Sequence, residues 1–329
     1  MSVWRHISDI LQTGQNCAMV TIASAAGSTP REAGARMVVR QDGSFYGTIG
    51  GGTLEFQAIK WAVAALEAGT TGLSIRTFSL GPDLGQCCGG RVDVAVEVHS
   101  LTQAQNARHL ATLESAGVMF ATQAAISDDC AVTREVLPIL PDEPFRLEAN
   151  TLLTETFGQD RRTLYLFGAG HVARALVLAL ANLPFRIIWI DSRADAFPAA
   201  VPSNVAKVSD ASPETLLQDA EHDAFILVMT HSHAMDEAIV AAALAKGRFP
   251  YVGVIGSATK RARFEKRMRA RGISQAAIAE LVCPIGTSLV ASKLPAAIAA
   301  GVTVELLAAD ETARTFVSTR LAQASASGR

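Results

Sequence analysis

A strand–turn–helix–strand pattern in the second half of the chain is the feature that most constrains its fold. The segment TLYLFGAGHVARALVLALANLPFRIIWIDSR opens at Thr163 with an apolar strand, turns through residues 168–173, and continues as a helix and a second apolar strand that ends at Asp191. A glycine loop between strand and helix, followed by an acid about 20 residues later, is typical of a dinucleotide-binding Rossmann unit. The sequence therefore predicts such a unit in this part of the chain.

The glycine loop and the end of the second strand carry the candidate ligand contacts of this unit. Gly168 and Gly170 let backbone N–H groups approach a pyrophosphate where His171 begins the helix. Asp191 is expected to accept hydrogen bonds from a ribose, and Arg193 leaves the choice between NAD and NADP open. A Rossmann fold that binds no dinucleotide is the alternative, because a fold does not determine a function.

Polar residues also follow the later strands of the second half. From residue 163 onward, apolar runs of strand length alternate with helical segments, which is the pattern of a doubly wound parallel sheet. The carboxyl ends of parallel strands lie along one edge of the sheet, where ligands bind. The residues expected to face one cleft at that edge are His171, Asp191, His231, His233, Ser257, Lys260, Arg261 and Cys283.

These residue types allow more than one kind of site. The pair His231 and His233 suits a metal ion, but no clear third ligand stands on the same element, so helix capping or phosphate binding is equally open. Lys260 and Arg261 follow a Gly-Ser turn and predict an anion clamp, with a solvated basic surface as the alternative.

The first half mixes strands and helices irregularly, which predicts an α+β domain. Helices are expected over residues 4–13 and 53–68, and strands over 17–23, 35–40, 45–49, 73–80 and 91–99, with weaker signals from 101 to about 160. Polar residues at 158–162 precede the change of pattern and indicate the domain boundary. The predicted class is α/β, with an N-terminal α+β domain over residues 1–160 and a Rossmann-like doubly wound parallel sheet over residues 161–329.

Two glycine-rich loops of the first half are candidate anion sites. Gly50, Gly51 and Gly52 allow a close backbone approach and run directly into a helix whose first N–H groups are free for an anion. Arg31 follows a proline that stiffens its loop, and it is the better candidate for an anion contact. Tight turning alone is the alternative interpretation of both loops.

The loop GPDLGQCCGGRVDV places Cys87 and Cys88 side by side between glycines. The chain has five cysteines, an odd and sparse set that does not form a disulfide framework. The N-terminal residues show no charged leader with an apolar core, so we expect a reducing, cytoplasmic protein with free thiols.

Composition excludes several classes of function. With 49% hydrophobic residues in 329, the chain has enough apolar side chains for two cores. The 29 basic and 31 acidic residues give a net charge of −2, which predicts no broad basic surface for nucleic acid. Charged residues, Gly and Pro interrupt every apolar run before the roughly 18 residues that a membrane span needs, so no transmembrane segment is predicted.

Seven motifs, in order along the chain, resemble the xanthine dehydrogenase accessory protein family, written XdhC/CoxI. They are GSTPREAGARM, GTIGGGTLE, GQCCGGRVDV, LFGAGHVA, THSHAMDEAIVAAAL, YVGVIGSATKRARF and CPIG, and they extend from Gly27 to about Gly286. The resemblance implies a chaperone, not an enzyme, that binds the molybdenum cofactor, Mo-molybdopterin. It implies that the protein protects this cofactor while a cysteine desulfurase replaces an oxo ligand by sulfur, and inserts it into the large subunit of apo xanthine dehydrogenase or into a related hydroxylase.

Under this resemblance the cysteine loop belongs to the cofactor site. Thiolates bind soft metals and accept sulfur, so at least one of Cys87 and Cys88 is expected to contact the molybdenum or its incoming sulfur. Burial of these thiols as small apolar side chains is the alternative. The phosphate of molybdopterin is expected at Arg31, the turn of residues 50–52 and the Lys260-Arg261 clamp.

Transfer of an unstable cofactor needs an interface that excludes water, which favours a homodimer or a transient complex. The main alternative function is an NAD(P)-dependent oxidoreductase with His231 or His233 as acid/base, and a nucleotide-sensing scaffold without chemistry is a third.

Overall fold

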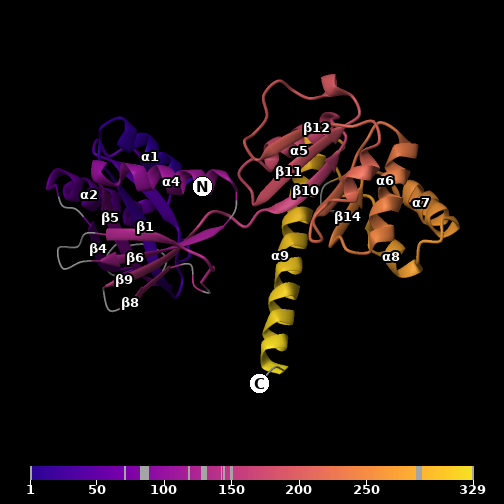
Figure 1. The fold of residues 1–329 in the computed structure, drawn as a ribbon. Coiled ribbons are helices and arrows are strands. Elements are labelled where there is room, and N and C mark those ends of the chain that lie inside the picture. The colour runs from indigo at the N-terminus through magenta and orange to yellow at the C-terminus, as the bar shows by residue number, and fades with distance from the viewer. Residues whose placement is uncertain are drawn as a thin grey trace. The chain divides into compact units, whose positions relative to one another are not determined.

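The computed structural model describes residues 2–69, 72–81, 89–117, 119–126, 132–141, 143, 145–148, 151–286 and 291–327. The chain divides into two compact units, Met1–Asp160 and Arg161–Arg329 (Figure 1). Each unit has its own sheets and its own apolar core, and each is described by itself below.

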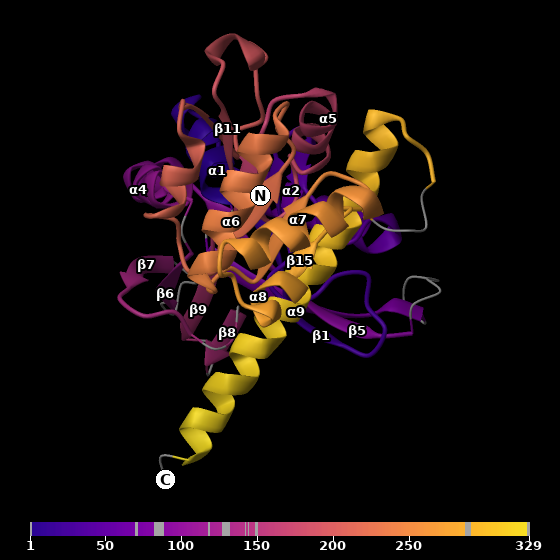
Figure 2. The same cartoon turned by 90° about the vertical axis from the view of Figure 1, so that its right-hand side faces the viewer.

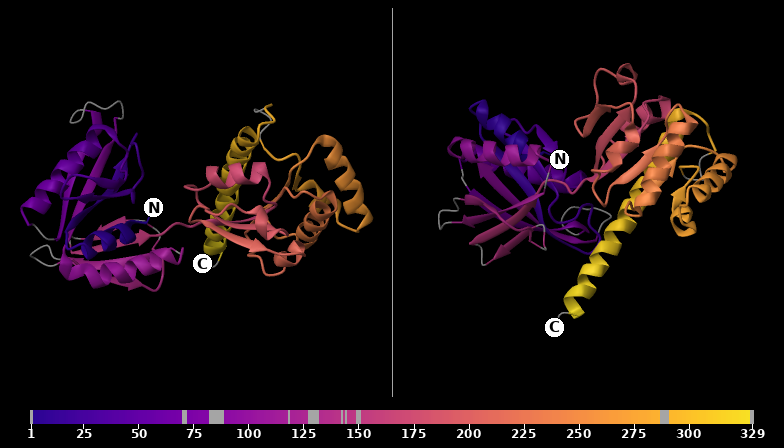
Figure 3. Two further views of the ribbon diagram at one scale, coloured as in Figure 1. Left: turned by 90° about the horizontal axis from the view of Figure 1, so that it is seen from above. Right: turned by 45° about the vertical axis from the view of Figure 1, so that its right-hand side comes forward.

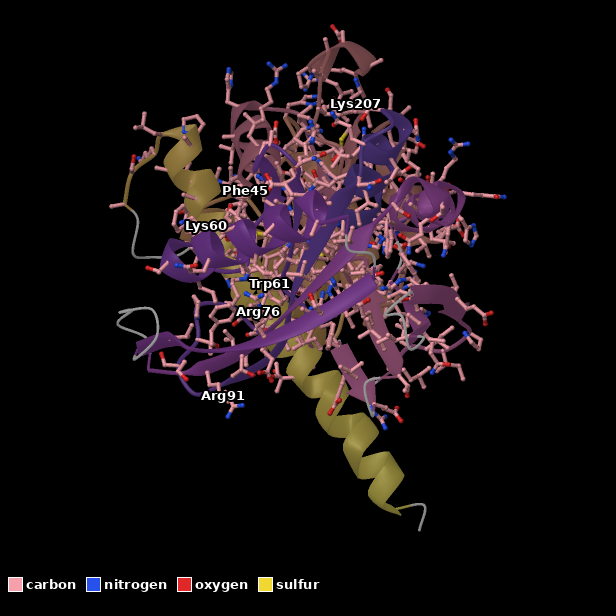
Figure 4. All side chains as sticks on the ribbon, turned by 90° about the vertical axis from the view of Figure 1, so that its left-hand side faces the viewer. Phe45, Lys60, Trp61, Arg76, Arg91 and Lys207 are labelled. Atoms are coloured by element: carbon pink, nitrogen blue, oxygen red, sulfur yellow. The ribbon has the colours of Figure 1, made fainter. Side chains whose placement is uncertain are left out.

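The N-terminal unit is built on a five-stranded antiparallel sheet. Its strands are β1 (Cys17–Ala26), β2 (Arg36–Arg40), β3 (Phe45–Gly47), β4 (Gly72–Ser79) and β5 (Arg91–His99), in the order β3-β2-β1-β5-β4. Helix α2 (Gly52–Glu67) buries Leu54, Ala58, Ala62 and Leu66 on this sheet, at the i, i+4 spacing of one helix face. The guanidinium carbon of Arg76 on β4 lies 4.4 Å from the ring centroid of Trp61 on α2 (Figure 4).

Residues 101–157 form a second layer that the sequence pattern did not reveal. After η1 (Leu101–Gln103) and α4 (Ala104–Ser115), the strands β6 (Phe120–Ile126), β7 (Val132–Leu137), β8 (Phe145–Glu148) and β9 (Leu152–Phe157) form an antiparallel sheet in the order β7-β6-β9-β8. Helix α1 (Val3–Gln12) packs against α4 through an apolar cluster that includes Trp4 and Phe157.

A buried ion network joins the two sheets of the N-terminal unit. The Arg134 guanidinium on β7 donates to Glu97 on β5 at 2.6 Å and to Glu155 on β9 at 2.5 Å, and Arg36 on β2 donates to Glu155 at 3.1 Å. All four residues are buried. These charged residues occupy buried positions of their strands, where an apolar residue is expected. They therefore interrupt the alternation of apolar and polar residues by which a strand is recognised in a sequence.

The C-terminal unit is a doubly wound Rossmann-like domain, which confirms the predicted fold class. Its six strands are β10 (Arg162–Phe167), β11 (Phe185–Asp191), β12 (Val205–Ser209), β13 (Phe225–Val228), β14 (Tyr251–Val254) and β15 (Leu281–Val282). They run parallel in the order β12-β11-β10-β13-β14-β15, so the strand order reverses between β10 and β13. The reversal point is where open parallel sheets bind ligands.

Helices cover both faces of this sheet (Figures 2 and 3). Helices α5 (His171–Ala179) and α9 (Pro295–Ser327) share one apolar cluster with Leu164 and Leu166 of β10. Helices α6 (His233–Lys246) and α7 (Ala258–Ala270), with η3 (Pro213–Leu217) and α8 (Gln275–Ala279), share another with Phe167. A short η2 (Ala194–Ala196) follows β11. Alternate residues of β10 therefore belong to opposite faces, as in any strand that is covered on both sides.

The register of the parallel strands brings their carboxyl ends to one line. Phe167 pairs with both Ile190 and Val228, and Val228 pairs with Val254. The residues that follow these strands therefore meet at one edge of the sheet. In the part of the chain that the structure describes, no helix is long and apolar enough to cross a membrane.

Candidate functional site

A pocket of about 530 Å³ lies at the carboxyl edge of β13 and β14, where the chain turns into α6 and α7. His231 and His233 line it from the β13–α6 turn, and Ser257 and Lys260 line it from the β14–α7 turn. Four of the residues that the sequence placed in one cleft are thus brought together. They come together because the two strands are neighbours in a parallel sheet, so their following turns are adjacent.

A buried ion pair lies beneath this pocket. One carboxylate oxygen of Asp236 accepts hydrogen bonds from the backbone N–H of Thr230 at 3.0 Å and from its hydroxyl at 2.7 Å. The other accepts from the Lys260 Nζ at 2.6 Å, and Nζ also donates to the Ile255 carbonyl at 2.7 Å. Two of the three N–H donors of the Lys260 ammonium thus have partners inside the protein, and Lys260 joins α7 to α6.

Two arginines that the sequence analysis did not select also line the pocket. Arg267 is ion-paired with Glu237, which also accepts from Arg271 at 3.1 Å. Arg263 is exposed and has no hydrogen-bond or ion-pair partner among the described residues. A signal for Arg263 and Arg267 was present in the sequence, because they follow Lys260 at the i, i+3 and i, i+7 positions of one helix face.

The N-termini of α6 and α7 both open at this edge. The Ser232 hydroxyl accepts from the backbone N–H of Met235 at 3.4 Å, and the Ser257 hydroxyl accepts from that of Lys260 at 3.3 Å. Each cap satisfies one of the first-turn donors of its helix, while the preceding N–H groups have no partner within the helix. Two helix dipoles therefore present their positive ends at the pocket.

The predicted dinucleotide-binding loop after β10 is hydrogen-bonded to Asp191, the acid at the end of β11. One oxygen of Asp191 accepts from the Ala169 N–H at 2.8 Å, and Arg193 donates to the same carboxylate through its backbone N–H and its guanidinium at 3.0 to 3.1 Å. Burial by itself raises the pKa of the Asp191 carboxyl, but the hydrogen bonds from Arg193 and Ala169 outweigh it and hold that pKa below its ordinary value. Asp191 is only 4% exposed, and the adjoining recess, which Gly168 and His231 also line, has no room for a water molecule.

Gly168 holds the loop in this closed position. Its φ is +105°, and a Cβ at this position would lie 2.3 Å from the Met229 carbonyl oxygen. Gly170 and His171 begin α5 and line neither the pocket nor the recess described above. The structure therefore separates Gly170 and His171 from the pocket, whereas Gly168 and His231 line the same recess.

Arg261 and Cys283 lie behind the pocket wall and not in the pocket. The Arg261 guanidinium donates to Glu265 at 2.9 Å and to the Leu281 carbonyl at 2.7 Å. The Cys283 thiol is buried against the Ser257 carbonyl, and burial raises its pKa. Arg261 thus bonds its neighbours within the unit, and it is Arg263 that is free at the pocket.

The turn of residues 50–52, predicted to bind an anion, is already bonded to the carboxylate of Glu55 on the helix that follows it. An oxygen of Glu55 accepts from the Thr48 hydroxyl at 2.6 Å, from the Ile49 N–H at 3.0 Å and from the Gly51 N–H at 3.3 Å. Gly50 has a φ of +125°, and a Cβ there would approach Pro30 to 2.7 Å, so this turn packs on the segment that carries Arg31.

Gly52, the last of the three predicted glycines, is the first residue of α2. Arg31 is exposed and lies in an open hollow formed by residues 29–35.

Cys87 and Cys88 lie outside the described residues. Gly90, two positions later, donates its N–H to the Ser28 carbonyl at 3.1 Å, and a Cβ on Gly90 would lie 2.4 Å from that oxygen. The strand that follows the cysteine loop is thereby held against the segment that leads to Arg31. Among the described side chains, no group of three or more His, Cys, Asp or Glu is arranged to hold a metal ion.

Comparison with protein families gives one match for each unit of the chain. The family described as XdhC Rossmann domain matches residues 164–306, and the XdhC and CoxI family matches residues 10–79. A crystal structure of a xanthine dehydrogenase from Bacillus halodurans shares the fold, with a TM-score of 0.73 and 22% identity over 95% of this chain and 96% of that one.

Three relatives are similar in sequence. The uncharacterized protein YqeB of Escherichia coli K12 is 28% identical over 89% of this chain and 44% of its own length. The molybdenum cofactor insertion chaperone PaoD of the same organism is 31% identical over 106 residues, 32% of either protein. A probable xanthine dehydrogenase subunit of Bacillus subtilis 168 is 24% identical over 77% of this chain and 83% of its own. The chain spans less than half the length of the first two of these relatives.

Proposed function

Because this chain belongs to the XdhC and CoxI family, we propose that it is an accessory protein that binds the molybdenum cofactor and inserts it into a molybdenum hydroxylase. The family matches fall in both units of the chain. The similarity to PaoD, which is named as a molybdenum cofactor insertion chaperone, supports this choice within the family. The similarity to a probable xanthine dehydrogenase subunit supports xanthine dehydrogenase as the recipient, and its large subunit is proposed as the part that receives the cofactor.

The pocket between α6 and α7 is the observation that carries the proposal. Its volume of about 530 Å³ lies within the range of roughly 300–1,000 Å³ that small-molecule sites occupy. Asp236 also lines the pocket, but it is 1% exposed and paired with Lys260, so Arg263 and Arg267 leave the lining with an excess of positive charge. An anionic cofactor of this size fits such a site, and a carrier needs no catalytic base within it.

The finer steps of this function follow from the cysteine loop. Cys87 and Cys88 are proposed to contact the molybdenum or its incoming sulfur, because thiolates are the protein ligands that bind soft metal centres and hold sulfur. The supporting observation is that Gly90 anchors the end of this loop to Ser28, close in sequence to Arg31. In this proposal a cysteine desulfurase supplies the sulfur, and the carrier works as a homodimer in the reducing cytoplasm.

An NAD(P)-dependent oxidoreductase is the less favoured function. Such an enzyme needs Asp191 to bind a ribose, whereas its carboxylate is bonded to Ala169 and Arg193. The recess beside the glycine loop also has no room for a water molecule. Both observations support a carrier that does not use a nicotinamide.

Co-purification tests the proposed function directly. The full chain would be produced in cells that make the molybdenum cofactor and in cells that do not, and molybdenum and molybdopterin would be measured in the purified protein. We expect both to be retained only in the first case, and to activate apo xanthine dehydrogenase when the two proteins are mixed. A protein that retains neither, and that reduces NAD(P) with a simple substrate, would show that the function is enzymatic.

A further inference from the structure

The pocket between α6 and α7 has the features of a phosphate site, whereas the glycine loop does not. We propose that this pocket holds the phosphate monoester group of an organic ligand, with Arg263 as its main side-chain contact, and that the loop after β10 holds no phosphate. The inference rests on the proposed function only in naming the molybdenum cofactor as the natural ligand. The phosphate site itself depends only on residues of the C-terminal unit.

Backbone donors reach the pocket from two helices. Helices α6 and α7 are 14 and 13 residues long, so each has a full dipole, and their first residues lie at one edge because β13 and β14 are paired in parallel. The caps Ser232 and Ser257 each bond a donor of the third helical residue, so the earlier N–H groups stay available. Two sets of donors that converge on one cavity favour an anion with several oxygens.

The side-chain charges of the pocket select a strongly anionic group. Lys260 is neutralised by Asp236, and Arg267 shares Glu237 with Arg271. Arg263 is the cation at the pocket that has no partner among the described residues. A phosphate monoester, with a charge near −2, complements a free guanidinium and two helix N-termini, and Arg binds phosphate in a bidentate geometry.

Two backbone donors of the glycine loop are already used inside the protein, although the N-terminus of α5 that follows carries no side-chain cap. The Gly168 N–H donates to the Ile190 carbonyl at 2.7 Å, and the Ala169 N–H donates to Asp191 at 2.8 Å. A pyrophosphate oxygen bound at the Ala169 N–H would have to displace the Asp191 carboxylate, which is also held by Arg193. The recess beside this loop also has no room for a water molecule, so the pocket between α6 and α7 is the better place for the ligand phosphate.

The cavity has room for more than a phosphate. Its walls include the apolar side chains of Ile255 and Phe264, while His231 and His233 are exposed at its lining. Apolar walls beside a cationic end suit a ligand with a ring system attached to a phosphate. A bare inorganic phosphate is thus a minimal probe of the anionic end of this site.

Phosphate titration of the full chain tests the assignment. Inorganic phosphate would be titrated into the parent, Arg263→Gln and Arg269→Gln, and binding would be followed by calorimetry and by ³¹P NMR line width. Arg269 is the matched control, since it lies on the same helix, bonds Glu265 and Gln275, and does not line the pocket. Both substitutions remove one positive charge, so long-range electrostatic effects cancel in the comparison.

We expect saturable binding in the parent, a loss of roughly tenfold in affinity in Arg263→Gln, and little change in Arg269→Gln. Absence of saturable binding in the parent would overturn the inference, and so would equal affinity in the two variants. An Arg31→Gln variant completes the set, because loss of phosphate binding in that variant alone would place the anion site in the N-terminal unit. Saturable NAD⁺ binding that persists in Arg263→Gln would refute the statement about the glycine loop.

Measuring the cofactor retained by the parent and by Arg263→Gln separates this inference from the proposed function. If the parent retains molybdopterin and Arg263→Gln retains it equally, the phosphate assignment is wrong while the carrier function stands. If phosphate binds through Arg263 but neither molybdenum nor molybdopterin is ever retained, the site is correct and the named cofactor is wrong.

Discussion

The Lys260 Nζ lies 2.6 Å from the Asp236 carboxylate, and this ion pair joins the first turn of α7 to the first turn of α6. The Asp236 side chain is 1% exposed and that of Lys260 is 12% exposed. Their contact links the two motifs THSHAMDE and GSATKRARF across neighbouring strands.

Replacing Lys260 by Met should destabilise the C-terminal unit by about 3–5 kcal/mol, because Asp236 would remain as a buried charge without its cation. Urea unfolding would measure the change. The matched control is Arg267→Gln, which removes a 53% exposed arginine and should cost less than about 1 kcal/mol. A cost for Lys260→Met as small as that of the control would contradict the buried-pair interpretation.

Gly168 should tolerate no side chain. Its φ of +105° and the 2.3 Å approach of a Cβ to the Met229 oxygen predict that Gly168→Ala costs more than about 2 kcal/mol. In contrast, a Cβ on Gly170 meets nothing within 4 Å, and Gly170→Ala should cost about 1 kcal/mol or less. Thermal unfolding of the two variants checks the difference, and equal costs would show that the loop is not packed against β13.

Asp191 should make unfolding pH-dependent in acid. Its folded-state pKa lies below the ordinary value, so the unfolded chain binds the proton more readily, and the carboxylate stabilises the fold above the unfolded pKa. That contribution should be lost as the pH falls below about 4 toward the folded pKa. Asp191→Asn should flatten this part of a plot of unfolding free energy against pH. An unchanged acid slope in Asp191→Asn would mean that other carboxyl groups produce it.

Cys17 should be inert to alkylation in the folded protein. Burial raises the pKa of its thiol to about 12, so almost no thiolate is present at pH 8. Mass spectrometry after brief treatment with iodoacetamide should find Cys17 unmodified, and fully modified after unfolding in urea. Rapid labelling of Cys17 without denaturant would show that β1 is not packed as described.

Cys87 and Cys88 should be needed for cofactor retention. Replacing both with Ala should leave the fold intact and lower the molybdenum and molybdopterin retained by the purified protein, because the soft ligands would be gone. The single variants show which thiol matters. If the double variant retains the cofactor and activates apo xanthine dehydrogenase as the parent does, the two thiols have no part in the function.

Much of the C-terminal unit was predictable, because apolar strands of a parallel sheet are continuous in sequence and their turns are marked by glycine or serine. The strands expected before residues 168, 191, 230 and 257 all form. The second sheet of the N-terminal unit was not predictable in the same way. Arg134 and Glu155 of this sheet are buried through an ion pair, and a charged residue in a strand is taken for an exposed one until its partner is known.

The sequence by itself determined which residues stand at the ends of β13 and β14, because strand periodicity and the serine caps are local signals. It also determined the family, through short motifs that survive in order along the chain. Only the tertiary structure decided which of the charged residues is free to bind a ligand. Lys260 is bound by Asp236, which lies 24 residues earlier, and Arg261 bonds the Leu281 carbonyl, which lies 20 residues later. Arg263 has neither kind of partner among the described residues. Pairing of charges depends on distances between elements that are remote in sequence, and those distances exist only after the sheet and its helices have assembled.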